Sequence, residues 1–238
     1  MPPDRTTSRI YPDLVAAGSL GAALDASLAE IACPLRSSRQ FFGKDSPSFA
    51  SVDSGHRFAQ IYIAAQERKF GLGIWEEHVE MATGWARELS DVALAIQTVL
   101  EHPDRKVSEL VEGVPFLQLK AKALSHERGT YIEDEWQRFL NHPLHEGGNL
   151  AFYWEELQKL IRLAAERPEL RRLWPFTSMI RFSVSPTPGR PDTTIPVIYS
   201  IGNGRYGLND YWGGPAVVEG EASVVLDALV ERIAIGES

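Results

Sequence analysis

The sequence predicts an α+β protein with two antiparallel sheets. Runs of alternating apolar and polar residues lie in two groups, and apolar stripes at helical spacing flank each group. We expect the strands of each group to pair antiparallel. Each end of the chain therefore has the order helix, three or four antiparallel strands, helix.

The two ends are offset by about 130 residues, which is too long for a solenoid repeat. A divergent duplication and a coincidence of common elements both explain the shared order. We expect an N-terminal α+β half over residues 1–102, a helical connector over 103–148 and a C-terminal α+β half over 149–238.

The N-terminal half begins with polar residues 1–9, which we expect to be irregular. An apolar helical stripe then runs from Ser19 to the stop at Pro34, and a polar loop follows over 35–47. Ser90 is the expected N-cap of a second helix. The strands predicted between these helices cover 48–52, 57–65, 69–75 and 78–85.

The connector and the C-terminal half read in the same way. Helices are predicted over 108–111, 131–142, 150–166, 169–173 and 221–233, with an extended segment at 114–117. Strands are predicted over 178–185, 194–201, 205–210 and 215–220. The pair Asn203-Gly204 is a strong signal for a tight hairpin, because both positions tolerate a positive φ.

Composition excludes several classes of function. The 238 residues are 44% hydrophobic, and no apolar run reaches the length that crosses a bilayer. No secretory signal is visible and Cys33 is the single cysteine, so we expect a cytoplasmic protein without an intramolecular disulfide. With 24 basic and 32 acidic residues the formal net charge is −8, which disfavours nucleic acid as a partner.

The histidines provide two candidate sites. His142 and His145 form H-x-x-H, a spacing that can hold a metal, but a loop flanked by proline and glycines favours two solvated side chains. We therefore expect no metal and no other cofactor. His126 and Glu127 combine a base and a carboxylate, but adjacent residues on a helix do not face each other. A helix end closed by Gly129 is the preferred interpretation.

Aromatic and arginine side chains supply the remaining candidates. Tyr211 and Trp212 lie in a loop rich in glycine and proline, where Trp212 is either a binding anchor or a lid over the end of the sheet. Arg171 and Arg172 end a helical turn. The candidate binding residues are Arg171, Arg172, Tyr211, Trp212 and His126, and no catalytic residue is assigned.

The segment Glu169–Ser183, ELRRLWPFTSMIRFS, reads as a reversal from a helix to a strand, with Trp174 and Phe176 buried. Together with the preceding helix FYWEELQKLIRLAAE it resembles the domain of unknown function 6193 family, mostly actinobacterial proteins labelled as natural-product biosynthesis proteins. KALSHERGTYIEDEWQRFL and ATGWARELSDVALAIQTVL are also similar to that family, so the resemblance covers about residues 57–233. The chain departs from the family at Trp174, where we expect phenylalanine, and at Met179, where we expect histidine.

The resemblance implies a role in a bacterial natural-product pathway but carries no reaction and no catalytic residues. Our leading hypothesis is a non-enzymatic accessory protein that binds a peptide, a protein or a small molecule. The first alternative is an immunity protein that neutralises a bacterial toxin, which an acidic and compact α+β chain would suit. The second alternative is a pathway enzyme whose site combines Arg171, Arg172, His126 and Glu127.

Overall fold

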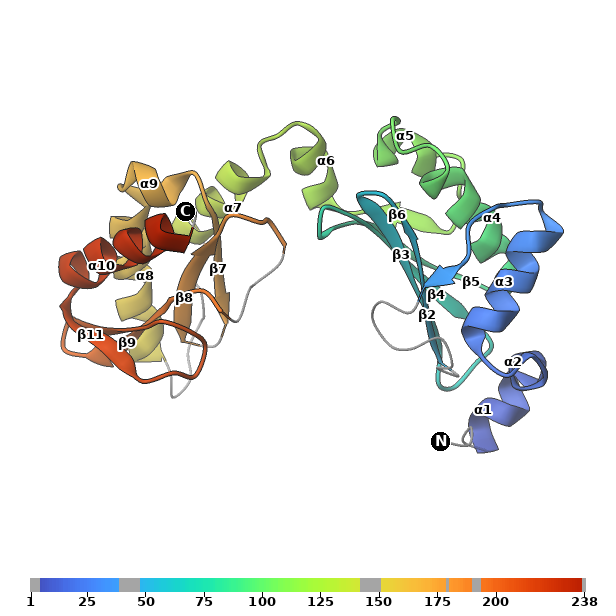
Figure 1. Ribbon diagram of the computed structural model, residues 1–238, viewed down its shortest axis with the longest axis horizontal. Coiled ribbons are helices and arrows are strands. Elements are labelled where there is room, and N and C mark those ends of the chain that lie inside the picture. The colour runs from blue at the N-terminus through green and yellow to red at the C-terminus, as the bar shows by residue number, and fades with distance from the viewer. Residues whose placement is uncertain (1–4, 39–47, 142–150, 179, 190–193, 237–238) are drawn as a thin grey trace. The chain divides into compact units, whose positions relative to one another are not determined.

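A computed structural model describes residues 5–38, 48–141, 151–178, 180–189 and 194–236 of the chain. It divides into two compact units, Met1–Glu127 and Arg128–Ser238, which we call unit 1 and unit 2. The boundary lies inside the segment predicted as a connector. Each unit contains one antiparallel sheet with helices packed on it, which confirms the predicted α+β class (Figure 1).

Unit 1 contains a six-stranded meander in which every strand pairs with its neighbours along the chain, in the order β1-β2-β3-β4-β5-β6. The strands are β1 (Ser37–Ser38), β2 (Phe49–Ser54), β3 (Arg57–Ile63), β4 (Phe70–Glu76), β5 (Val79–Ala86) and β6 (Leu117–Leu119). The four central strands match the predicted strands to within a few residues. Strand β6 joins the edge of the sheet only after a helical excursion.

The helices of unit 1 are α1 (Arg5–Ile10), α2 (Pro12–Ala17), α3 (Leu20–Glu30), α4 (Leu89–Leu100), α5 (Val107–Val111) and α6 (Ala121–Glu127). Helices α3 and α4 pack on each other and on β2, and they cover one face of the sheet (Figure 1). Ser19 caps α3 by accepting a hydrogen bond from the amide of Ala22 at 3.0 Å.

Two predictions in unit 1 are wrong. Residues 1–9 were expected to be irregular, but residues 5–9 lie in α1, a short polar helix whose sequence shows no apolar stripe. Ser90 is not a cap, because α4 begins one residue earlier and its N-cap is Glu88, without a side-chain hydrogen bond.

Unit 2 contains a five-stranded meander with the order β11-β10-β9-β8-β7. Its strands are β7 (Trp174–Ser178), β8 (Arg181–Ser185), β9 (Val197–Gly202), β10 (Arg205–Asn209) and β11 (Ala216–Glu221). Its helices are α7 (Tyr131–Asn141), α8 (Ala151–Ala165), α9 (Pro168–Arg171) and α10 (Ala222–Gly236). The hairpin between β9 and β10 is confirmed, with φ of 55° at Asn203 and 71° at Gly204.

The core of unit 2 lies between the sheet and the helices. Trp136 of α7 is fully buried against Phe182 of β8, with the two ring centroids 6.0 Å apart. The Trp136 indole N–H donates to the Leu173 carbonyl at 2.9 Å, which ties α7 to the chain just before β7. Leu160 and Leu229 add the apolar stripes of α8 and α10 to this core.

The prediction that Trp174–Thr177 form a chain reversal is wrong. These residues form β7, an edge strand paired with β8, in which Trp174 lies opposite Ser185. Phe176 is buried as predicted, and Trp174 is half-buried and stacked on Phe176 with ring centroids 5.3 Å apart. The strand predicted to start at Ser178 begins at Arg181.

The two units share more than the order of their elements. In both, a helix precedes a five-strand meander (β1–β5 and β7–β11) and a second helix follows. In both, a tyrosine on the third strand lies over a glycine directly opposite it on the fourth. The pairs are Tyr62 with Gly71 and Tyr199 with Gly207.

None of the helices in the described part of the chain is long and apolar enough to cross a membrane.

Candidate functional site

The loop after β10 holds the two predicted aromatic residues. Tyr211 is 52% exposed, whereas Trp212 is half-buried beneath the guanidinium of Arg181, which lies 4.9 Å from the centre of its ring. An ion pair between Asp210 and Arg232 of α10 anchors the start of the loop. The two aromatic side chains thus differ in exposure, since the Tyr211 ring lies against Gly214 but is half in solvent, whereas Trp212 is covered by Arg181.

Asn209 links the two ends of this loop. Its side-chain N–H donates to the Gly214 carbonyl at 2.6 Å, and the residue is only 3% exposed. With Asn209 and Asp210 both engaged, the loop has a fixed geometry at its base.

The two predicted arginines have different environments. Arg171 forms two hydrogen bonds to the carboxylate of Glu133 on α7, at 2.5 and 3.1 Å, and lies 5.4 Å from the centre of the Trp136 ring. Hydrogen bonds from Gln137 and then from Arg171 lower the pKa of Glu133. Arg171 therefore joins α9 to α7, while Arg172 lies exposed at the end of α9.

His126 and Glu127 point to different partners, as helix geometry predicts. The Glu127 carboxylate accepts hydrogen bonds from the backbone and hydroxyl of Ser108, at 2.9 and 2.6 Å, near the start of α5. The His126 Nε2 atom lies 3.8 Å from Glu76 and 4.0 Å from Glu77. Gly129 follows with a positive φ of 73°.

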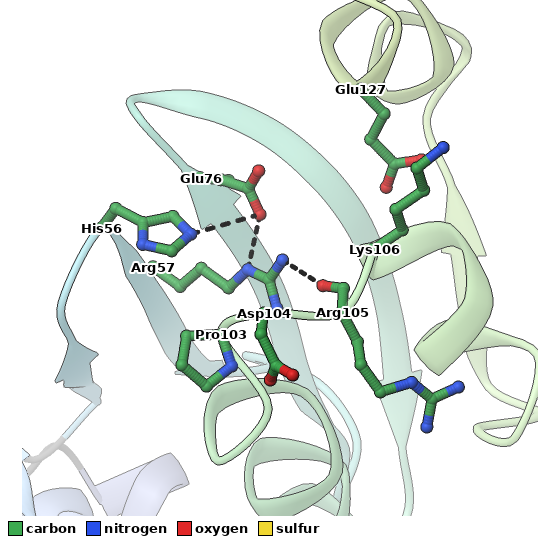
Figure 2. A pocket seen from close by; sticks show the side chains of 8 residues that line it. All are labelled: His56, Arg57, Glu76, Pro103, Asp104, Arg105, Lys106 and Glu127. Atoms are coloured by element: carbon green, nitrogen blue, oxygen red, sulfur yellow. Dashed lines mark hydrogen bonds and ion pairs between the residues drawn. The ribbon is translucent and has the colours of Figure 1, made fainter.

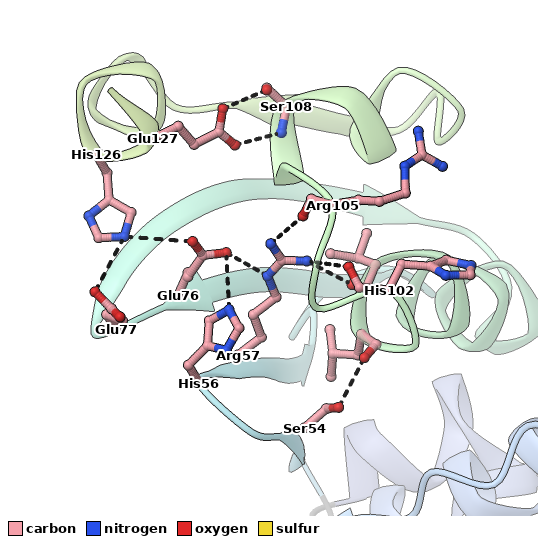
Figure 3. A network of polar contacts seen from close by, with 12 residues as sticks. Ser54, His56, Arg57, Glu76, Glu77, His102, Arg105, Ser108, His126 and Glu127 are labelled. Atoms are coloured by element: carbon pink, nitrogen blue, oxygen red, sulfur yellow. Dashed lines mark hydrogen bonds and ion pairs between the residues drawn. The ribbon is translucent and has the colours of Figure 1, made fainter. Parts of the chain in front are cut away.

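A cluster around Glu76 was not predicted from the sequence (Figure 3). We define it as His56, Arg57, Glu76, Glu77 and His126. Arg57 and Glu76 face each other across β3 and β4, with the Arg57 Nε 2.5 Å from the Glu76 carboxylate. The His56 Nε2 lies 3.9 Å from the same carboxylate. The Glu76 carboxylate thus pairs with Arg57 and lies near the imidazoles of His56 and His126.

Arg57 itself has a structural role. It is 3% exposed, and its remaining N–H groups donate to the carbonyls of Val99, His102 and Arg105. These carbonyls lie at and just beyond the end of α4, where the helix dipole favours a positive charge. Arg57 therefore fastens the end of α4 to the sheet and positions Glu76.

A small pocket of about 190 Å³ opens beside this cluster (Figure 2). It is lined by His56, Arg57, Glu76, Pro103, Asp104, Arg105, Lys106 and Glu127. Both signs of charge line it, so it suits a small polar group better than an apolar ligand. A carboxylate beside an imidazole can relay a proton. Of the residues named for the alternative of a pathway enzyme, Glu127 lines this pocket and His126 lies 3.8 Å from the Glu76 carboxylate.

No group of three or more His, Cys, Asp or Glu side chains within the described ranges is arranged to hold a metal ion. The predicted pair His142 and His145 lies outside the described residues, as does Met179.

Unit 2 is thus an α+β unit whose surface presents an anchored aromatic loop. Residues 130–231 match the model of a family of unknown function, DUF6193. The match supports the resemblance to that family over this part of the chain. The match does not extend to the earlier similar segment at 82–100. Comparison with curated proteins and with solved structures found no match.

Proposed function

We propose that the protein is a non-enzymatic accessory protein of a bacterial natural-product pathway, and that it binds a peptide, a protein or a small molecule of that pathway. The observation that carries the proposal is the anchored loop of Tyr211 and Trp212 in the family segment. The pathway role is supported by the resemblance of residues 167–185 to a family labelled with that role.

The loop has the properties of a binding anchor. Tyrosine, tryptophan and arginine dominate binding energies at interfaces, because they bury a large area and form directed contacts. Here Tyr211 is exposed and Arg181 lies over Trp212. The Asp210–Arg232 pair and the Asn209–Gly214 hydrogen bond fix the loop before binding. A fixed loop loses little entropy on binding, which favours affinity.

Alanine variants of the loop test this proposal. A complex would first be captured from a bacterial host with the full chain as bait, and its affinity would then be measured by calorimetry. Tyr211→Ala and Trp212→Ala should each weaken binding about tenfold or more. Phe152→Ala is the matched control, because Phe152 is a 50% exposed aromatic residue on α8 of the same unit. Equal affinities for the wild type and both loop variants would remove the loop from the interface.

The second candidate function is a pathway enzyme, and one observation favours it. Glu76 is held by Arg57 beside the pocket of about 190 Å³, with His126 3.8 Å from its carboxylate. Such a pair could accept and return a proton during a reaction. In that case His126→Ala would abolish turnover while Trp212→Ala would leave it unchanged.

A further inference from the structure

The sheet of unit 1 has a second face. Helices α3 and α4 cover one side of β2–β5 (Figure 1). Side chains alternate along a strand, so the residues between those that contact the helices point the other way. On β3, for example, Ala59 and Ile61 are fully buried, whereas Phe58, Gln60 and Tyr62 are each partly exposed. We call the side that carries these three residues the outer face.

The strand register arranges the outer face in three rows that cross the strands. Residues directly opposite each other in a sheet share a face and touch. The first row is Asp53, Phe58, Trp75 and Glu80. The middle row is Ser51, Gln60, Gly73, Thr83 and Gln118. The third row is Phe49, Tyr62, Gly71 and Trp85. Two aromatic rows therefore border a polar one.

The rings in both aromatic rows are held in place. Phe58 and Trp75 stack within 5° of parallel, with their centroids 5.7 Å apart. Tyr62 and Trp85 meet edge to face at 5.0 Å. Because Gly71 has no side chain, the Tyr62 ring can lie flat on the strand beside it. Trp85 remains 47% exposed, so this row offers apolar area that no described part of the chain covers fully.

The dimensions of the outer face suit an extended chain. Neighbouring strands are about 4.8 Å apart and residues two apart along a strand are about 7 Å apart. Ser51, at the β2 end of the middle row, is only 2% exposed. From Gln60 on β3 to Gln118 on β6 the row extends over about 14 Å, the length of about four extended residues. An extended segment that follows this row would place its backbone over the amides of Gln60 and Gln118. Its alternating side chains would reach the two aromatic rows.

The charges beside the first row favour a basic segment. Asp53 and Glu80 end this row, and Glu77, whose side chain is 66% exposed, lies in the adjoining turn. The chain's own lysines already bind here. Lys122 lies 5.9 Å from the centre of the Trp75 ring, and Lys120 is 3.7 Å from Glu80. A positive charge is attracted to an aromatic face and to carboxylates, and the chain has a net charge of −8.

We propose that the outer face of β2–β5 binds an extended basic peptide segment of a partner protein, along the polar row and between the two aromatic rows. This site lies in unit 1, outside the segment that matches DUF6193. It goes beyond the loop proposed above, which lies in unit 2.

A displayed library of random linear peptides tests the proposal, with the full chain as the target. Selection should enrich peptides that combine lysine or arginine with apolar residues. A synthetic copy of an enriched peptide would then be titrated by fluorescence anisotropy. Trp85→Ala should weaken its binding about tenfold or more, and Asp53→Lys should weaken it while reducing its dependence on salt. Leu94→Ala is the control, because Leu94 is 55% exposed on α4, which covers the opposite face.

Two variants keep the test decisive if one of them fails to fold, which a thermal melt of each would reveal. The proposal is overturned if no peptide is enriched, or if the enriched peptides bind Trp85→Ala and Asp53→Lys as well as the wild type. Loss of binding in Trp212→Ala alone would overturn this site but support the loop of unit 2. A glycan array that binds through Trp85 without any peptide enrichment would also reject the peptide as occupant.

Discussion

The ring of Tyr62 lies directly over Gly71, the residue opposite it on the next strand. Tyr199 lies over Gly207 in the same way in the other unit, where a Cβ atom at the glycine would be 2.7 Å from the tyrosine ring. In unit 1 this pairing flattens an aromatic row against the sheet. In each unit, the absence of a side chain at the glycine thus lets the tyrosine ring lie against the neighbouring strand.

Alanine substitutions at Gly71 and at Gly84 should differ in how much they lower the free energy of unfolding. At Gly71 the new Cβ would meet the Tyr62 ring, which can swing toward solvent, so Gly71→Ala should cost under about 1 kcal/mol. At Gly84 it would meet the backbone carbonyl of Phe116, so Gly84→Ala must part β5 from β6 and should cost about 1–3 kcal/mol. Denaturant unfolding measures both, and equal costs would contradict the assigned contacts.

Trp136 should be the most sensitive aromatic residue of unit 2. It is fully buried and its N–H bonds to the Leu173 carbonyl. Trp136→Ala should therefore lower the free energy of unfolding by about 3–5 kcal/mol. Trp136→Phe keeps an aromatic ring but leaves the Leu173 carbonyl unpaired, and should lower the free energy of unfolding by about 1–3 kcal/mol. Chemical denaturation with Phe152→Ala as an exposed control measures these losses, and a neutral Trp136→Ala would refute the packing.

Unit 2 should lose stability in alkali. Burial raises the pKa of Tyr206 to about 12 from its ordinary value of 10.0. Because the unfolded chain releases this proton first, the stabilisation is complete below pH 10 and declines as the pH rises toward 12. Tyr206→Phe should cost about 1 kcal/mol at neutral pH, through loss of the bond to the Glu156 carbonyl, but should flatten the alkaline decline. Unfolding of both proteins followed by circular dichroism between pH 10 and pH 12 measures this decline. An equally steep decline in Tyr206→Phe would contradict the assigned cause.

The Asp13–Arg68 pair should stabilise the folded chain slightly at neutral pH and lose this effect in acid. Arg68 donates to both Asp13 oxygens, at 2.8 and 2.9 Å, and these hydrogen bonds lower the pKa of Asp13 below 3.8. The contribution is therefore present above about pH 4 and is lost as the pH falls through the lowered pKa. The pair is partly exposed, so Asp13→Asn should cost under about 1 kcal/mol at neutral pH. The melting temperatures of the two proteins should converge in acid.

Local chemistry explains which parts of the fold could be predicted. Ser19 and Pro34 bracket the first long helix, and Asn203-Gly204 marks a hairpin, because each signal acts within a few residues. Strand β7 was missed because Pro175 argues against a central strand. The sheet tolerates it there because β7 is an edge strand, where a missing N–H costs little.

The candidate sites depended on contacts between distant residues. The buried Arg57 side chain donates hydrogen bonds to the carbonyls of Val99, His102 and Arg105. No sequence pattern around Arg57 predicts these hydrogen bonds. The rows of the outer face likewise depend on the register of four strands. The exposure of Tyr211 could be anticipated from its loop of glycine and proline, whereas the contact of Arg181 with Trp212 could not.

One measurement tests the central claim of binding without turnover most directly. Molecules captured by the full chain would be incubated with wild type and with His126→Ala, and their masses followed over time. We predict that both proteins retain the captured molecule with its mass unchanged, and that Trp212→Ala retains less of it. Conversion of the molecule by the wild type, lost in His126→Ala, would contradict the account and establish an enzyme.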